Sequence, residues 1–222
     1  MSRDAQEKYY WAVKDGREMF DAKVRELSDQ KDILEYGCAT GDVSHQLAPI
    51  SKSVSGIDIS EVAIKKAQEN AASNEAFAVM NAEEMDFDAG SFDFLFGCGI
   101  VHHLDVEKCA NEVHRVLRDD GVAMFWEPLG HNVAINYYRH LTPEARTEDE
   151  HPLKKSDIET LKSVFSDVVV RHYGFFTIAG VPFRGSALGS TVFGITRFFD
   201  KILFSIPGLK WQSWYTIIEC RK

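Results

Sequence analysis

An acidic residue and a glycine turn follow one another closely in the first quarter of the chain. Glu35 stands in an apolar run, and Gly37, Ala39 and Gly41 follow it in the pattern Gly-x-Ala-x-Gly. Glycines bend a chain sharply and let a ligand approach bare backbone. A carboxylate just before such a turn suits a ligand that carries a cationic amine better than one that carries a pyrophosphate. The pattern therefore indicates a site for a nucleoside cofactor.

A second carboxylate, Asp58, lies near the end of the next apolar segment, residues 53–59. Ligands of open parallel sheets bind beyond the carboxyl ends of the strands, where a carboxylate can accept both hydroxyls of a ribose. The turn is not the Gly-x-Gly-x-x-Gly of dinucleotide sites, and no Lys-Ser/Thr pair of a phosphate loop follows it. A nicotinamide enzyme is therefore a remote alternative.

Apolar segments of strand length alternate with helical patterns and must position these residues. The expected strands are 32–38, 53–59, 77–80, 92–98, 122–126, 168–173 and 214–220. The expected helices are 4–27 with a kink at Gly16, one from Asp42, one capped by Ser60, one ending at Leu117, and one opened by a capping box at Ser156. This alternation predicts a parallel sheet that is covered by helices on both faces.

Two segments stand outside this rhythm. Residues 127–155 form a long polar connection, which in compact domains is usually functional or disordered. Residues 175–210 form an apolar insertion, in which a helix would carry a narrow polar stripe beside a wide apolar face. Such a face is consistent with four roles: a cap packed on the domain, the wall of an apolar substrate tunnel, contact with a membrane surface, or core packing alone.

Charge and cysteine usage exclude several classes of function. The net charge of −9 argues against nucleic acid as the main substrate. Residues 171–222 hold seven Lys/Arg against two acids, a balance of +5, which leaves −14 on the rest. The four cysteines lie far apart without metal-ligand spacing, so we expect reduced thiols and no metal. With no apolar leader and no apolar run near the ~20 residues of a membrane span, we expect a cytoplasmic protein.

Four ordered motifs resemble those of class I S-adenosylmethionine-dependent methyltransferases. Within that class they are similar to the small-molecule methyltransferases of the ubiquinone and menaquinone group. Residues 35–41 resemble the first motif, 56–60 the second, 81–84 the third, and 98–104, which end in His-His-Leu, the fourth-strand segment. The resemblance covers roughly residues 30–127. It departs at Ala39, where the family usually has glycine.

The resemblance implies an α/β fold in one domain over 1–222: a Rossmann-like, doubly wound, seven-stranded sheet, mostly parallel with an antiparallel last strand. An N-terminal helical lid would take residues 1–30, the cofactor-binding core 31–127 and a substrate-side loop 128–155. An apolar helical cap, 175–210, would be inserted between strands six and seven.

The implied cofactor is S-adenosyl-L-methionine, with S-adenosyl-L-homocysteine as product and no metal. The glycine turn would approach the methionine moiety, Asp58 would hold the ribose, and residues 81–83 would contact the adenine. The predicted cofactor-binding residues are Glu35, Gly37, Cys38, Ala39, Thr40, Gly41, Asp58, Ile59, Asn81, Ala82, Glu83, Cys98 and Tyr10.

Methyl transfer is an in-line displacement, so positioning and a dry pocket supply much of the rate, and only a protonated nucleophile needs a base. His102, His103 and Glu127 are the candidate catalytic residues, although a histidine could also pack the start of a helix. His131, Arg139 and Tyr9 are the candidate substrate-binding residues. We expect a hydrophobic or aromatic small molecule whose acceptor atom is oxygen, nitrogen or carbon.

Three alternatives stay open on the sequence. The fold hosts more than methylation, so the chain could use S-adenosylmethionine for other chemistry. It could also be a non-catalytic, cofactor-binding partner subunit of a larger assembly. Residues 188–206, finally, could make peripheral contact with a membrane.

Overall fold

A twisted sheet of seven strands forms the centre of the protein, whose computed structural model describes residues 10–141 and 151–222. The strands are β1 Asp32–Tyr36, β2 Ser53–Asp58, β3 Glu75–Val79, β4 Phe92–Cys98, β5 Leu117–Pro128, β6 Asp167–Tyr173 and β7 Tyr215–Arg221. Their order is β3-β2-β1-β4-β5-β7-β6, and β7 runs antiparallel to both of its neighbours. The pairs among β1 to β5 are parallel. The predicted mostly parallel sheet with an antiparallel last strand is confirmed.

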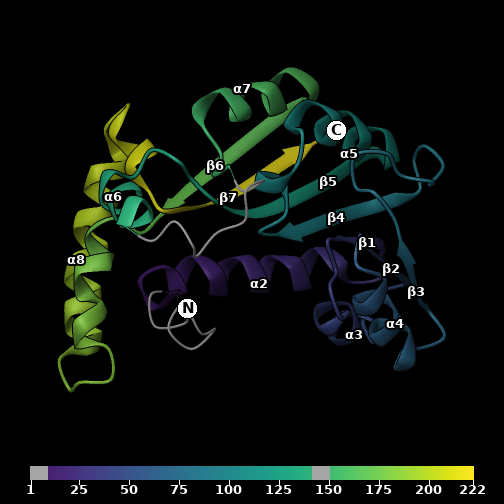
Figure 1. Cartoon of the computed structure of the whole chain (residues 1–222), viewed down its shortest axis with the longest axis horizontal. Helices are drawn as coiled ribbons and strands as arrows, with labels where there is room; N and C mark the ends of the chain where they lie inside the picture. Colours follow the sequence, from purple (N-terminus) through teal and green to yellow (C-terminus); the bar gives the residue numbers. More distant parts are fainter. Residues whose placement is uncertain (1–9, 142–150) are drawn as a thin grey trace.

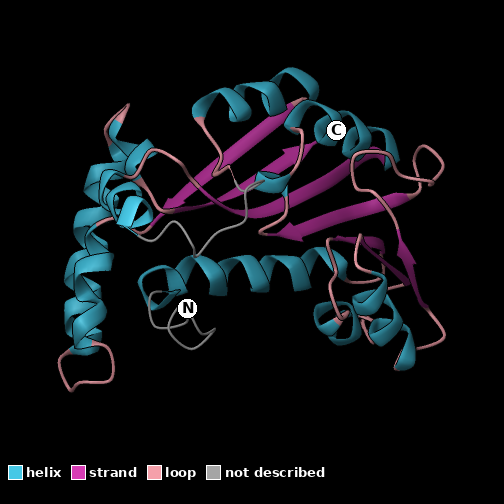
Figure 2. Ribbon diagram, in the orientation of Figure 1, coloured by secondary structure: helices cyan, strands magenta, loops and turns pink. Residues whose placement is uncertain are grey.

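Helices cover both faces of this sheet (Figure 1; Figure 2). The α-helices are α2 Lys14–Ser28, α3 Asp42–Leu47, α4 Glu61–Glu69, α5 Val106–Val116, α6 Val133–Leu141, α7 Lys155–Val164 and α8 Gly189–Ser205. The 3-10 helices are η1 Trp11–Val13, η2 Val101–His103, η4 Phe176–Phe183 and η5 Leu209–Gln212. In Figure 1, α5 and α7 lie on one face of the sheet and α2 lies on the other. No helix of the described residues is long and apolar enough to cross a bilayer.

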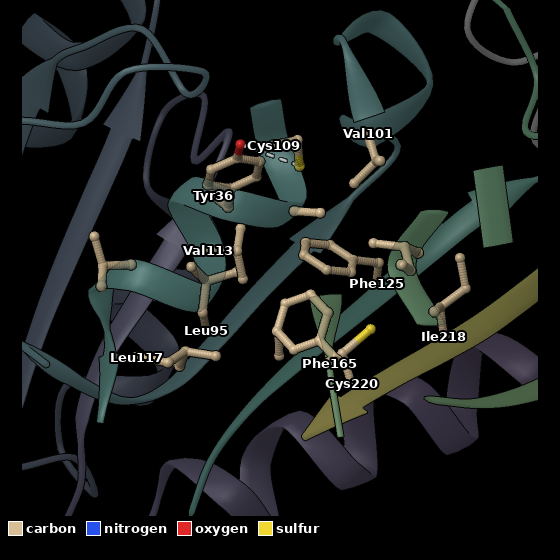
Figure 3. Close-up of a cluster of buried hydrophobic side chains, with 14 of the residues drawn as sticks. Tyr36, Leu95, Val101, Cys109, Val113, Leu117, Phe125, Phe165, Ile218 and Cys220 are labelled. Carbon is tan, nitrogen blue, oxygen red and sulfur yellow. Dashed lines mark hydrogen bonds between the residues drawn. The ribbon is translucent and has the colours of Figure 1, made fainter. Parts of the chain in front are cut away.

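The core has one apolar layer on each side of the sheet. Figure 3 shows the layer under α5 and α7, where Tyr36, Phe125 and Val113 meet and every labelled side chain is at most a few per cent exposed. The Tyr36 hydroxyl reaches the rim of this layer, where it donates to the backbone oxygen of Ala82 at 2.7 Å and to Cys109 Sγ at 3.3 Å. Core packing therefore fixes the segment after β3, which the sequence predicts to contact adenine.

Glu35 is a buried carboxylate that joins β1 to α3. Glu35 is 8% exposed. Its Oε2 accepts hydrogen bonds from the Ser44 N–H at 3.0 Å and the Ser44 hydroxyl at 2.5 Å. Burial penalises the charged form and raises the pKa of Glu35 to about 7, against the lowering effect of these two bonds.

Three expectations about helices are wrong. Gly16 does not interrupt its helix, because α2 runs unbroken from Lys14 to Ser28. Residues 127–155 are not all loop, since 133–141 form α6. The helix α7 starts one residue before Ser156, and its cap is the Asp157 carboxylate, which accepts the Lys154 N–H at 2.7 Å. The helical cap and Ser60 as N-cap of α4, which accepts the Ala63 N–H, are as predicted.

Substitution of Gly16 tests why α2 carries a glycine in its interior. A β-carbon there would lie 2.6 Å from Cγ of Tyr173 and 2.8 Å from Cη2 of Trp126, both of them ring atoms. We expect Gly16→Ala to lower the free energy of unfolding by about 1–3 kcal/mol through overpacking. The matched control is Gly194→Ala in α8, where nothing lies within 4 Å, and it should gain up to about 1 kcal/mol. Equal gains in urea unfolding would contradict the packing argument.

The raised pKa of Glu35 predicts a dependence of stability on pH. Between pH 4.5, the ordinary pKa of a glutamate, and about pH 7, the Glu35 carboxyl keeps its proton in the folded protein and loses it in the unfolded chain. The contribution of Glu35 to stability therefore falls as the pH rises through that range. Glu35→Gln keeps an acceptor for Ser44 without the charge. With rising pH the variant should therefore gain stability relative to the parent, by up to about 3 kcal/mol in the free energy of unfolding. The measurement is urea unfolding of variant and parent from pH 4 to 8. If the difference between their unfolding free energies stays constant over this range, the pKa of Glu35 is not raised.

Candidate functional site

The glycine turn after β1 holds three residues in the left-handed conformation. Gly37, Ala39 and Gly41 have φ angles of 79°, 46° and 76°. The N–H groups of Gly37 and Cys38 both donate to the Ile57 oxygen at 2.9 Å, which anchors the turn to β2. Ala39 holds a conformation that costs a non-glycine residue about 1–2 kcal/mol. Ala39 thus replaces the usual glycine at a position whose backbone conformation favours glycine.

Asp58 connects the first two predicted motifs. Its Oδ2 accepts the Ala39 N–H at 2.9 Å, and its Oδ1 accepts the Ser60 N–H at 2.9 Å. Each carboxylate oxygen keeps a further lone pair, so the group can still accept two ribose hydroxyls. Ile59, beside it, is 81% exposed and offers an apolar surface at the same edge. The arrangement fits the predicted ribose site.

The third motif is held by its own polar groups. Asn81 Oδ1 accepts the Glu83 N–H at 3.0 Å. Glu83 Oε1 in turn accepts the Asp105 N–H at 2.8 Å, just before α5. Glu83 therefore braces the start of α5. Asn81 is exposed at the sheet edge, and the Ala82 backbone is fixed by Tyr36.

A fully buried carboxylate, Glu127 at the end of β5, organises the turn after β4. Its Oε1 accepts the N–H groups of Ile100 and Val101, each at 2.9 Å. Its Oε2 lies 2.7 Å from Nδ1 of His102, whose ring packs on that of His103 with centroids 4.1 Å apart. Both Glu127 oxygens are thus engaged within the protein, and the group orients His102 rather than facing a ligand directly.

The same turn is in contact with the glycine turn. A β-carbon on Gly37 would lie 3.0 Å from Cγ1 of Ile100, so only a glycine leaves room for the Ile100 side chain. Glu127 holds the Ile100 backbone from the other side. The structure thereby brings the first and fourth predicted motifs together.

A cavity of about 550 Å³ opens beyond the ends of β4 and β5. Its walls come from η1 and α2 on one side and from the central strands on the other. The lining residues are Tyr10, Trp11, Val13, Lys14, Arg17, Glu18, Cys98, Gly99, Trp126 and Tyr215. Four of them are aromatic, which suits an apolar or aromatic guest. The predicted residues Tyr10 and Cys98 are among them.

Cys98 lines the cavity as a neutral thiol. Arg17 Nη1 donates to its Sγ at 3.0 Å, while burial raises the pKa of Cys98 to about 11 in spite of that cation. Arg17 also pairs with Asp21 at 2.8 Å. The Arg17 guanidinium therefore stands at the cavity wall as a fixed positive group.

Not every predicted residue reaches this cavity. His131 Nε2 accepts the Lys155 N–H at 3.0 Å, and Arg139 donates to the Leu129 oxygen at 3.3 Å. Neither residue lines the cavity, and Tyr9 lies outside the described residues. Within residues 10–141 and 151–222 no group of three or more His, Cys, Asp or Glu is placed to hold a metal.

Half of the aromatic wall, and the cation beside it, was not predicted from the sequence. The sequence does not mark Trp126, Tyr215 or Arg17 as site residues, because Trp126 and Tyr215 follow the apolar pattern of strands and Arg17 follows that of a helix surface. The one usable signal is the run of aromatic residues at 9–11, which lies within the predicted N-terminal lid, residues 1–30. Two of its members, Tyr10 and Trp11, line the cavity.

Comparison with known proteins matches these observations. Residues 34–125 match a family model described as a methyltransferase domain. The demethylmenaquinone methyltransferase of Lactococcus lactis is 29% identical over 184 residues, which cover 71% of each chain. Three other curated relatives, one from Methanocaldococcus jannaschii and two from Bacillus subtilis, are covered over only 38%, 58% and 43% of their length. The chain thus spans about half of these relatives.

Solved structures share the fold at low identity. Haemonchus contortus phosphoethanolamine N-methyltransferase 2 in complex with S-adenosyl-L-methionine has a TM-score of 0.65 at 16% identity, covering 92% of this chain and 52% of that one. The [4+2]-cyclase SpnF has a TM-score of 0.59 at 14% identity, covering 92% and 80%. The fold, the ordered motifs and the matched model agree: residues 34–125 are similar to a methyltransferase domain, and the chain has the fold of S-adenosylmethionine-dependent methyltransferases.

Proposed function

We propose that this chain binds S-adenosylmethionine along the glycine turn, Asp58 and residues 81–83, and transfers its methyl group to a hydrophobic or aromatic small molecule. The observation that carries the proposal is the position of the cavity. Its wall at Cys98 and Gly99 belongs to the turn that packs on Gly37 through Ile100. The acceptor space and the cofactor turn therefore both border one short turn, so reactants bound at the two places would be neighbours, as an in-line transfer requires.

The cofactor, when bound, supplies an electrophilic sulfonium methyl group. The backbone of the turn at residues 37–41 would contact its methionine part, and Asp58 has free lone pairs for its ribose. The four aromatic side chains of the cavity would cover part of a bound acceptor and so limit its contact with water, which favours a reaction in which positive charge is dispersed. The chain's contribution is thus to hold, align and dry the reactants.

For an acceptor that loses a proton, His102 is the proposed base. Glu127 Oε2 accepts a hydrogen bond from Nδ1–H of His102 at 2.7 Å, and in this tautomer Nε2 carries the free lone pair. The His102 ring lies beside the cavity, because its Cε1 is 3.7 Å from the place of a β-carbon on Gly99. A hydroxyl group held near Gly99 could pass its proton to this ring. His103, stacked on the ring, would support its position.

A test with methyl-labelled cofactor separates this function from its alternatives. The chain is incubated with labelled S-adenosylmethionine and a series of phenols and extracted apolar metabolites, and labelled products are sought. Label on an apolar or aromatic product is expected. Cofactor binding without any transfer would favour other chemistry or a non-catalytic subunit, as the fold shared with a [4+2]-cyclase allows.

Loss of the Asp58 carboxylate should weaken cofactor binding. Two hydrogen bonds to a charged acceptor are worth enough that Asp58→Ala should raise the Kd for S-adenosylmethionine about 10- to 100-fold or more, measured by calorimetry. Glu61→Ala, which removes an exposed acid a few residues away, is the control and should leave the Kd unchanged. An unaltered Kd in folded Asp58→Ala protein would rule out the ribose assignment.

Removal of His102 should affect turnover more than binding. With a phenolic acceptor found in the labelling test, His102→Ala should lower kcat by about 10²–10⁴-fold, and the Kd for S-adenosylmethionine should change little. Glu127→Gln should lower kcat as well and shift its pH profile, because the histidine tautomer is no longer fixed by a carboxylate. Unchanged turnover in both variants would remove the histidine from the mechanism.

A further inference from the structure

One face of α8 is apolar and points to solvent. Leu188, Ile195, Phe198, Ile202 and Ile206 follow one another at helical spacing, and each is between 45% and 62% exposed. Phe199, next to this row, is 49% exposed. Figure 1 draws α8 at the end of the molecule, away from α3 and α4. We call this row, with Phe199, the outer face of α8.

The opposite face of α8 is the one that packs on the protein. Phe193 is 8% exposed and meets the Trp11 ring edge-on, with centroids 4.9 Å apart. Asp200 is 4% exposed and accepts the N–H of Phe176 at 2.6 Å and the Thr177 hydroxyl at 2.9 Å. These contacts fix which side of the helix faces inward. The outer face therefore has no role in the core of the described chain.

Flanking segments extend the apolar surface. Phe176 and Phe183 in η4 are 40% and 45% exposed, and Leu209 in η5 is 42% exposed. Isolated exposed apolar residues need no explanation, whereas a contiguous set this size marks a contact surface.

The charges around this surface are almost all positive. Residues 174–214 contain four basic residues, Arg184, Arg197, Lys201 and Lys210, and one acid, Asp200. The Asp200 carboxylate is buried against the backbone of η4 and faces no solvent. Arg197 pairs with Asp15 of α2 at 2.6 Å, while Lys201 is exposed beside the outer face. The chain as a whole carries −9. An anionic surface would thus attract this end of the molecule and repel the rest.

We propose that the outer face of α8, with its flanking phenylalanines and basic residues, docks on an anionic lipid membrane. An apolar row rimmed by lysine and arginine is the pattern of helices that lie in the membrane interface, and α8 is not a spanning helix. A symmetric dimer through the same face is disfavoured, because it would bring the basic residues of two copies together. The proposal does not depend on the reaction that the domain catalyses.

The docking surface lies next to the cavity. Trp11, which lines the cavity, packs on Phe193 of α8, and Lys14, also in the lining, lies 4.5 Å from the centroid of the same ring. Docking would hold this wall of the cavity close to the lipid surface. An acceptor dissolved in the bilayer would then have a short path to the cavity.

Sedimentation with vesicles tests the proposal. The full chain is mixed with vesicles of phosphatidylcholine alone or with about 30% phosphatidylserine. We expect binding to the mixed vesicles that weakens with salt, and much weaker binding to phosphatidylcholine alone. Phe198→Ser with Ile202→Ser should reduce binding at least tenfold, because two apolar anchors are lost. Lys201→Glu should reduce it about fivefold or more.

The matched control removes exposed apolar side chains elsewhere. Val62→Ser with Val79→Ser, which are 69% and 49% exposed on α4 and β3, should bind vesicles like the parent. Circular dichroism and thermal unfolding confirm that each variant is folded. Absence of binding to anionic vesicles would overturn the proposal, as would equal losses in both double variants. A dimer in light scattering that only the α8 variant abolishes, without vesicle binding, would show that the face joins two copies instead.

Discussion

The carboxylate of Glu127 is removed from water at the end of β5 and has to be satisfied by the protein. A buried charge without partners would cost several kcal/mol, and hydrogen bonds to backbone N–H groups and to a histidine offset that cost. The partners that Glu127 takes, Ile100, Val101 and His102, all belong to the turn after β4. That turn is therefore held in one shape, which the other parts of the site depend on. The Ile100 side chain packs against Gly37, and Gly99 lines the cavity.

The cavity needs a second constraint, which is the close approach of α2 to the sheet. Gly16 lets the helix come down on Trp126 and Tyr173, since any larger residue would meet their rings. Trp126 then stacks on Tyr215 at 4.8 Å between centroids, and both rings line the cavity. Helix α2 also brings Arg17 to Cys98 at the cavity wall. The result is a cavity with aromatic walls and with Lys14, Arg17 and Glu18 at its lining, beside the turn after β4.

Much of the fold and of the cofactor edge could be predicted from the sequence, because their signals are local. Gly37, Gly41 and Asp58 are tied to strand ends, so their spacing along the chain determines where they lie in the sheet. The aromatic wall could not be predicted in this way. Trp126 and Tyr215 come from strands that are far apart in sequence, and each alone follows the alternating pattern of a core strand. The placing of Glu83 against α5 likewise depends on a contact with Asp105 across the fold.

Periodicity also limits what can be said of the insertion. A wide apolar face predicts a helix, but not which side of it packs on the domain. Here Asp200, a polar residue, points inward and Phe198 outward, because the η4 backbone offers the carboxylate several N–H donors. His131 and Arg139 show the same limit for the connection after β5. Their side chains bond to the backbone of Lys155 and Leu129, and no local pattern distinguishes such residues from ligand-binding ones.

The central claim is that the cofactor edge and the aromatic cavity form one reaction site around the turn at residues 98–101. A crystal structure with S-adenosylhomocysteine tests it most directly. We expect the ribose at Asp58, the homocysteine part along residues 37–41, and the thioether sulfur directed past Gly99 toward the cavity. A sulfur that points away from the cavity, or a ligand bound elsewhere on the chain, would contradict the account.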